Sequence, residues 1–242
     1  MALARTVRPE TLDGLAENDP RAIRSRRDLQ RVNRVMGTRG IVLRGLRQAL
    51  AGRTYTSLRM LELGAGDGSL MLAIAQKLSP TWPSVELILL DRQRLVDEKT
   101  IEGFAKLGWR AESLNLDVRD WVAAPDALRF DAIVTNLFLH HFDHGELPAL
   151  LGSIGGRCDV FFACEPRRAI VSLAGSHLIG ALFVNGVTRE DAVLSVRAGF
   201  RDREISTLWP EDAHRWALHE YSAGLFSHCF SAARHERRFD AS

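Results

Sequence analysis

One stretch decides the fold: Leu61-Glu62-Leu63-Gly64-Ala65-Gly66-Asp67-Gly68-Ser69-Leu70. An apolar run leads into three glycines at alternate positions, and a helical pattern begins at Ser69. Glycines let the backbone turn sharply and approach a ligand closely, and the amides that open the helix can bind an anionic group. The spacing differs from the dinucleotide pattern G-x-G-x-x-G, because Ser69 stands in the third glycine's place and Gly68 comes one residue early.

On both sides of this turn, apolar runs alternate with helical patterns. Runs at 58–63, 85–90, 110–116, 130–135 and 159–164 predict strands, with helices at 69–78 and 96–107 between them. Unbroken apolar runs are typical of parallel strands buried on both faces, and strand–helix alternation implies right-handed crossovers. We therefore predict an α/β fold with a doubly wound, mostly parallel, seven-stranded Rossmann-like sheet. Its last two strands are expected at 204–208 and about 217–230, antiparallel at one edge, after a helix capped at Thr188 with Asp191 in the capping box.

The remaining segments flank this sheet. Residues 1–52 read as an N-terminal helical lid or extension before a main domain at 53–242, with one helix starting at Asn18-Asp19-Pro20 and a second over 41–50. Ten arginines and one acid, Asp28, lie between Arg21 and Arg53. We interpret this run as a solvated lid face, with an anionic partner as the alternative.

In doubly wound sheets the ligand binds beyond the carboxyl ends of the strands. The polar residues that follow the predicted strands are therefore the candidate binding residues. Asp91 follows the second strand, Asp117 the third and Asn136 the fourth, while Glu62 lies within the first strand just before the glycines.

These residues carry a family resemblance. The stretch ELGAGDG resembles the E/D-x-G-x-G-x-G motif of class I methyltransferases that use S-adenosylmethionine (SAM), and LILLD, NLDVRDW and FDAIVTNLFLHHF resemble that family's following strand ends. The resemblance covers about residues 58–165. It implies SAM as cofactor, with Asp91 on the ribose hydroxyls, Asp117 at the adenine amino group and Glu62 near the methionine ammonium. The full set of expected cofactor residues is Glu62, Gly64, Ala65, Gly66, Gly68, Asp91, Arg92, Asp117, Val118 and Asn136.

Histidines supply the candidates for chemistry. In NLFLHHFDH, His140 or His141 could take a proton from an acceptor near neutral pH. The alternative is that Asn136 and His140 only satisfy backbone groups in the loop. His144 and His177 are candidate acceptor contacts. A metal site built from His140, His141, Asp143 and His144 has the right residue types, but the metal-dependent catechol-type enzymes place acids here, so we expect no metal.

Composition bounds the remaining choices. The chain has 242 residues, a formal net charge of +2 and three cysteines without metal-site spacing, which we interpret as reduced thiols. With no apolar segment typical of a secretory signal at the N-terminus, we expect a cytoplasmic protein. The apolar stretch 169–187 is long enough for a bilayer but polar within, so we predict a buried helix against a pocket instead of a membrane span.

The predicted function is methyl transfer from SAM to a small, lipophilic or aromatic acceptor, with oxygen as the expected atom. The leading helices, DLQRVNRVMGTRGIVLRGL, are similar to those of bacterial natural-product methyltransferases. The fourth-strand loop lacks the N/D-P-P-Y/F motif of nucleobase amine methyltransferases, and we do not expect nucleic acid as partner. Three alternatives stay open: C-methylation of a quinone- or polyketide-like ring, a non-catalytic SAM-fold binding protein, and an NAD-type oxidoreductase.

Overall fold

A computed structural model describes residues 3–124, 128–178, 184–210 and 213–235. Seven strands form a single sheet in the order β3-β2-β1-β4-β5-β7-β6. Their bounds are β1 Ser57–Leu63, β2 Ser84–Asp91, β3 Trp109–Asn115, β4 Phe130–Asn136, β5 Cys158–Pro166, β6 Trp216–Ala223 and β7 Ser227–Arg234. Strands β1 to β5 pair in parallel, whereas β7 is antiparallel to both β5 and β6. The predicted α/β class and mostly parallel seven-stranded sheet are confirmed.

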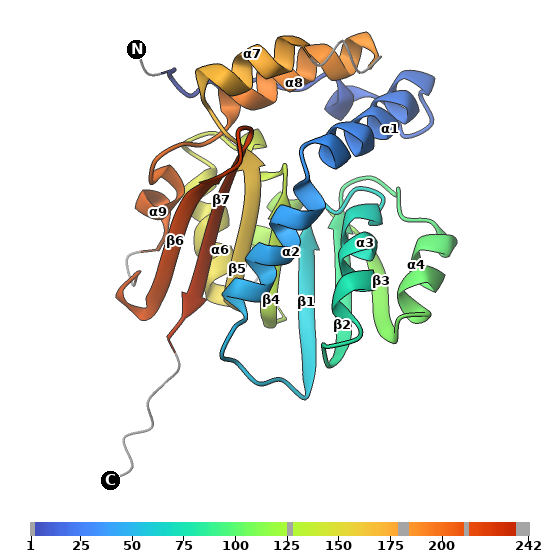
Figure 1. Cartoon of the computed structure of the whole chain (residues 1–242), viewed down its shortest axis with the longest axis vertical. Helices are drawn as coiled ribbons and strands as arrows, with labels where there is room; N and C mark the ends of the chain where they lie inside the picture. The colour runs from blue at the N-terminus through green and yellow to red at the C-terminus, as the bar shows by residue number, and fades with distance from the viewer. Residues whose placement is uncertain (1–2, 125–127, 179–183, 211–212, 236–242) are drawn as a thin grey trace.

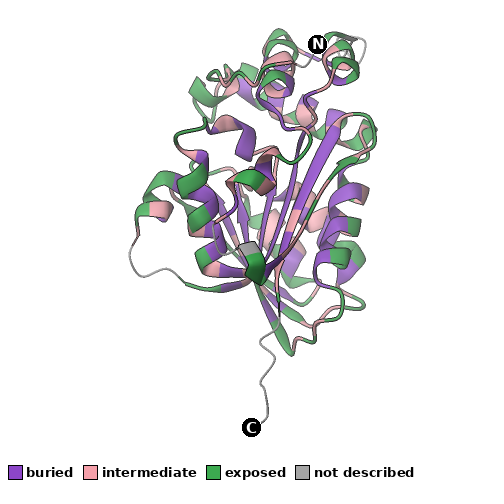
Figure 2. Ribbon diagram, turned by 90° about the vertical axis from the view of Figure 1, so that its left-hand side faces the viewer, coloured by how far each residue is buried: buried purple, intermediate pink, exposed green. Residues whose placement is uncertain are grey.

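Helices cover both faces of this sheet (Figure 1). One face carries α2 Thr38–Ala49, α3 Ser69–Leu78 and α4 Glu98–Ala105; the other carries α5 Val118–Ala123, α6 Leu147–Arg157 and α9 Glu204–Leu208. Each face has its own apolar core, and the central strands are buried between the two (Figure 2). Helices α1 Pro20–Val35, α7 Ile170–Leu178 and α8 Gly186–Ala198 lie together beyond one end of the sheet (Figure 1).

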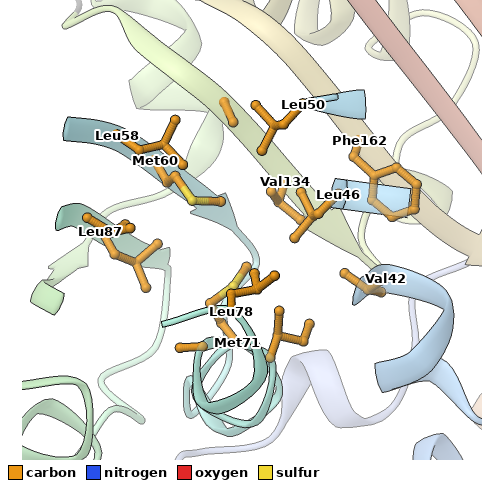
Figure 3. Close-up of a cluster of buried hydrophobic side chains, with 14 of the residues drawn as sticks. Val42, Leu46, Leu50, Leu58, Met60, Met71, Leu78, Leu87, Val134 and Phe162 are labelled. Carbon is orange, nitrogen blue, oxygen red and sulfur yellow. The ribbon is translucent and has the colours of Figure 1, made fainter. Parts of the chain in front are cut away.

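Helix α2 belongs to the core of the sheet. Its Val42 and Leu46 are buried among β-strand side chains, close to Phe162 of β5 (Figure 3). Gly45 brings the helix closest to the strand, because a Cβ at this position would lie 2.1 Å from the Phe162 ring. A domain boundary at residue 52 would separate α2 from this core. Within residues 1–52, the part that lies outside the core is α1 and the segment before it.

Two local predictions near the C-terminus were wrong. Residues 204–208 form helix α9 instead of a strand, and residues 216–234 hold both final strands as a hairpin. A five-residue run carries too little periodicity to separate helix from strand. Here tertiary contacts decide, because the Glu220 carboxylate of β6 accepts hydrogen bonds from the backbone N–H groups of Ile205 (3.0 Å) and Ser206 (2.8 Å).

The start of α8 also differs from the prediction. Asn185, and not Thr188, is the N-cap, and its side chain accepts from the Thr188 N–H at 2.9 Å. The backbone N–H of Asn185 in turn donates to Asp28 of α1 at 2.8 Å. The helix therefore starts where a contact between α1 and α8 fixes the chain. At the start of α1 the prediction was correct, since Asp19 caps a helix that begins at Pro20.

The apolar stretch 169–187 lies only in part within the described residues. Its first half forms α7, which packs on α8 and leaves Ile170 and Val171 exposed. No residue of α7 lines the main cavity, so the prediction of a buried helix against a pocket was wrong for this half. No helix in the described ranges has the length and apolar character needed to cross a membrane.

Candidate functional site

The glycine-rich turn joins β1 to α3 at the carboxyl edge of the sheet. The N–H groups of Gly64 and Ala65 donate to the carbonyl of Leu90 at the end of β2 (2.9 and 3.1 Å). Gly64 has φ +70° and Gly68 has φ +73°, values that favour glycine. A Cβ at Gly64 would also lie 2.3 Å from the Phe138 ring. The turn therefore needs glycine for both its backbone shape and its close packing.

A cavity of about 640 Å³ opens beside this turn. The ends of β1 to β4 form one wall, while α1 and the chain before it form the other. Nine of the ten predicted cofactor residues line it: Glu62, Gly64, Ala65, Gly66, Asp91, Arg92, Asp117, Val118 and Asn136. The tenth, Gly68, is the N-cap of α3 and packs toward Leu89 and Thr100. The structure thus brings together residues that span 75 positions of the sequence.

Glu62 is a buried carboxyl group that lines this cavity. It is 3% exposed, and among the described residues no hydrogen-bond partner meets its Oε2 atom. Burial, with smaller contributions from the nearby charges of Asp67 and Asp91, raises the pKa of Glu62 to about 8. A buried polar atom without a partner is costly. A cationic ligand group in the cavity would remove that cost, and an ammonium group suits the position.

The other strand ends present acceptors to the cavity. The Asp91 carboxylate accepts from the N–H groups of Gly66 (2.8 Å) and Gln93 (2.9 Å), which fixes its orientation. Asp117 caps α5 by accepting from the Arg119 N–H at 2.8 Å. In Asn136, Oδ1 is buried without a hydrogen-bond partner in the described part of the chain. Carboxylates that keep spare lone pairs suit a ligand that carries hydroxyl groups.

The opposite wall comes from a segment that the sequence analysis did not single out. Residues 3–15, here called the N-terminal strap, precede α1, and five of them line the cavity: Val7, Arg8, Pro9, Leu12 and Asp13. Helix α1 adds Arg26, Leu29, Gln30 and Asn33. The lid was expected from helices alone, and the strap has no periodicity or motif that would have marked it.

Polar contacts hold this wall against the strand ends. Gln30 Nε2 of α1 donates to Asp67 Oδ2 of the glycine turn at 2.6 Å. Arg92 pairs with Asp13 Oδ1 at 3.2 Å, and Gln93 Nε2 donates to the Leu15 carbonyl at 3.3 Å. The N-terminal strap and α1 therefore close over the cavity.

His141 lines the cavity, as expected for a candidate base. Its Nδ1 lies 3.1 Å from Asp13 Oδ2 of the N-terminal strap, and its side chain is 26% exposed. Burial by itself would raise the pKa of Asp13, but the hydrogen bond and charge of His141 together with the charge of Arg92 hold it below the usual range. Asp13 is therefore an ionised partner at one ring nitrogen, and Nε2 is the other nitrogen of the ring.

His140 has a different environment from its neighbour. It is 3% exposed and does not line the cavity. Its Nδ1 lies 2.8 Å from Glu165 Oε2, and its Nε2 lies 3.4 Å from Glu10 Oε1. Burial would lower the pKa of His140, but these two carboxylates raise it to about 9. A ring that is protonated and enclosed at neutral pH is a poor proton acceptor, so the geometry favours His141 over His140 as a base.

The two candidate acceptor contacts lie away from the cavity. His144 is exposed in the loop before α6, and His177 is exposed near the end of α7. Neither side chain lines the cavity. Apolar contacts come instead from Phe138 and Phe142 after β4 and from Leu12 of the N-terminal strap.

One group of side chains has donor types that suit a metal ion. Glu10, His140 and His141 each bring one potential ligand atom to within 4.8 Å of the others. Each already has a protein partner: Glu10 and His140 face one another, Glu165 holds His140, and Asp13 holds His141. Hydrogen bonds and ion pairs account for this arrangement without an added cation.

Comparison of the sequence with models of known protein families gives no match. Comparison with curated proteins gives none either.

Solved structures, in contrast, share the fold. An O-methyltransferase family protein from Burkholderia thailandensis is 19% identical with a TM-score of 0.61, over 91% of this chain and 61% of that one. This chain thus spans less than two thirds of that protein. The plantazolicin methyltransferase BamL was solved with a triazolic desmethylPZN analog and SAH (S-adenosylhomocysteine). It is 14% identical with a TM-score of 0.64, over 93% of this chain and 94% of that one. The plantazolicin methyltransferase BpumL, solved with SAH, is 14% identical with a TM-score of 0.63, over 90% of this chain and 92% of that one.

The likeness extends over nearly the whole chain, and the cavity lies at the carboxyl edge where doubly wound sheets bind ligands. The chain therefore has the Rossmann-like fold of the class I SAM-dependent methyltransferases.

Proposed function

We propose that this protein binds SAM in the cavity and transfers its methyl group to a small, lipophilic or aromatic acceptor, on oxygen. The observation that carries the proposal is Glu62, a buried carboxyl without a partner at Oε2, in the same cavity as the glycine turn and Asp91. This combination suits a ligand with an ammonium group at one end and ribose hydroxyls further along. Neighbours of the same fold were solved with SAH.

Each part of the cofactor has residues that would hold it. Glu62 would bind the methionine ammonium, Asp91 the ribose hydroxyls, and Asp117 with Val118 the adenine ring. When bound, SAM supplies a methyl group on a sulfonium, which is already a good leaving group. The protein contributes position, exclusion of water and removal of a proton from the acceptor.

The acceptor end of the cavity lies near the loop after β4 and the N-terminal strap. Phe138, Phe142 and Leu12 supply apolar surface, which favours an aromatic or lipophilic acceptor. His141 lines the cavity, and an imidazole nitrogen there can accept a phenolic proton. An O–H acceptor uses this histidine directly.

Calorimetric titration with SAM, SAH and NAD tests the cofactor. We expect both adenosyl ligands to bind and NAD not to bind. Asp91→Ala should weaken SAH at least tenfold, about 1.4 kcal/mol, while Asp120→Ala, an exposed acid on α5, should leave it unchanged. Binding of NAD alone would refute the proposal.

Release of SAH in the presence of SAM and a panel of phenols tests the reaction. Turnover of at least one phenol, abolished by boiling, would support O-methylation. Turnover restricted to carbon acceptors such as quinols would favour C-methylation instead. SAH binding without turnover of any acceptor would favour a non-catalytic binding protein.

A further inference from the structure

We propose that Asp13 of the N-terminal strap is the positioning residue that makes His141 a base: it holds the imidazole proton on Nδ1 and leaves Nε2 free to accept a proton from the acceptor. The inference rests on the proposed function for the role of His141. The juxtaposition itself, a carboxylate from residue 13 against a cavity histidine at residue 141, stands on the geometry.

The Asp13 carboxylate is shared in a way that fixes the orientation of both its oxygens. Oδ2 lies 3.1 Å from His141 Nδ1, and Oδ1 lies 3.2 Å from Arg92 Nη2. Arg92 Nη2 donates its hydrogen bond to the Asp13 backbone carbonyl and forms an ion pair with Oδ1, so the oxygen that faces the guanidinium is an unprotonated one. The other oxygen of the ionised carboxylate then accepts from His141 Nδ1–H. The hydrogen bond at one ring nitrogen sets which tautomer the ring adopts.

The N-terminal strap is held in place just before Asp13. The backbone N–H groups of Thr11 and Leu12 both donate to the Asp191 carboxylate of α8, at 2.8 and 2.9 Å. Three residues before Asp13, Glu10 contacts Ser195 of α8 and His140. These contacts hold residues 10–12 and so restrict where Asp13 can lie. Preorganised orientation of a base is what lowers the barrier in such dyads.

The chemical step balances with these groups. The acceptor O–H passes its proton to His141 Nε2 as the oxygen forms its bond to the methyl carbon. The carbon–sulfur bond breaks with its electron pair on sulfur, which leaves the neutral thioether SAH. The imidazolium that forms carries its charge beside the Asp13 carboxylate, and this contact stabilises it. No oxidant or further reactant is needed.

Asp13→Asn is a sharp test because Arg92 determines how the amide is oriented. The guanidinium charge favours the amide oxygen over the NH₂ group on its side, so the NH₂ group faces His141 and donates to Nδ1. The ring is then forced into the opposite tautomer, with its proton on Nε2. Nitrogen-15 NMR of the imidazole reads the tautomer directly in the apo protein, and His141→Gln assigns the signal.

We expect the neutral ring to carry its proton on Nδ1 in the wild type and on Nε2 in Asp13→Asn. Glu17→Ala is the matched control, because it removes another anchor of the same region, the carboxylate that accepts from the Arg94 N–H at 2.7 Å. It should leave the tautomer of His141 unchanged. An Nε2–H ring in the wild type would overturn the inference. The same switch in Glu17→Ala would also overturn it, because the effect would then come from closure of the region and not from Asp13.

Kinetics provide the second readout, with a phenol that the wild type methylates. Asp13→Asn should lower kcat by about 100-fold or more, within the range for loss of general base catalysis, with SAH affinity within about fivefold of wild type. If the wild type does not bind SAH, the proposed function fails while the tautomer result still decides the role of Asp13. If SAH binds and Asp13→Asn retains full kcat, the inference fails alone.

Discussion

Replacing Glu62 with glutamine removes the buried carboxyl group that we propose for the ammonium group, and it changes the number of protons released on binding, which calorimetry can measure. Burial raises the pKa of Glu62 to about 8, so the fraction of apo molecules with a protonated Glu62 at pH 7 is about 0.9. An ammonium group at this position favours the carboxylate, so binding should expel that proton. At pH 9 only about 0.1 proton remains to be expelled.

Titration of SAH in two buffers of different ionisation enthalpy measures the proton released. We expect about 0.9 proton per SAH at pH 7 for the wild type and close to none for Glu62→Gln. A charge-assisted hydrogen bond contributes about 1.5–3 kcal/mol, so the variant should bind SAH about 10- to 150-fold more weakly. Glu112→Gln, on the exposed face of β3, is the matched control and should behave as wild type.

The stability of the apo protein gives an independent check with a definite sign. The folded state keeps its Glu62 proton up to about pH 8, whereas the unfolded chain loses it near 4.5. The unfolded state therefore binds fewer protons in this window, and stability falls as pH rises through it. At about 1.4 kcal/mol per pH unit the loss reaches about 5 kcal/mol. Glu62→Gln avoids this loss, so its advantage over wild type should grow from pH 4 to pH 8. SAH binding without proton release, or with unchanged affinity in the variant, would refute the reasoning.

Three further predictions concern stability and the glycine turn. In the folded state the pKa of His140 is about 9, against an ordinary value of 6.5. The protonated ring therefore contributes about 3 kcal/mol to the free energy of unfolding below pH 6.5, and this contribution is lost as the pH rises through 9. His140→Gln should then cost more at pH 6 than at pH 10 in urea unfolding, and equal costs would contradict this. Gly45→Ala should destabilise by about 1–2 kcal/mol through overpacking. Gly152→Ala, where a Cβ meets open space in α6, should instead stabilise by about 0.5–1 kcal/mol in thermal unfolding. Gly64→Ala and Gly52→Ala both place a side chain at positive φ, at a cost of about 1–2 kcal/mol each, but calorimetry should show weaker SAH binding only for Gly64→Ala.

The strand-end wall of the cavity, which we propose for the cofactor, could be predicted because local sequence determines it. The glycine turn after one strand and the acid at the end of the next are both short sequence patterns. Because these two strands are parallel and adjacent in the sheet, the two patterns lie at the same edge. Nine of the ten residues predicted on this basis line one cavity. Gly68 differs because a left-handed residue at the start of α3 serves the helix and not the cavity.

The opposite wall, which we propose for the acceptor, could not be predicted, because it is built by contacts between distant parts of the chain. Thr11 and Leu12 are held by Asp191, about 180 positions away in sequence. The N-terminal strap has no regular structure over residues 3–10 and so no periodic pattern. His177 is a different case: a histidine in an apolar run suggested an acceptor contact, but its side chain is exposed on α7, which packs beside α8.

The adjacent histidines show why a motif alone could not assign the base. His140 and His141 lie in a 3₁₀ turn, Leu139–His141, with their ring centroids 4.2 Å apart, but the two rings have different carboxylate partners. One ring turns inward between Glu10 and Glu165, and the other reaches the cavity beside Asp13. Each histidine meets a carboxylate from the N-terminal strap, but the buried ring is held by two and stays protonated, whereas the cavity ring has one carboxylate partner and a second nitrogen available for chemistry. The number of carboxylates around each ring, set by the fold and not by the histidine pair, separates the structural residue from the candidate base.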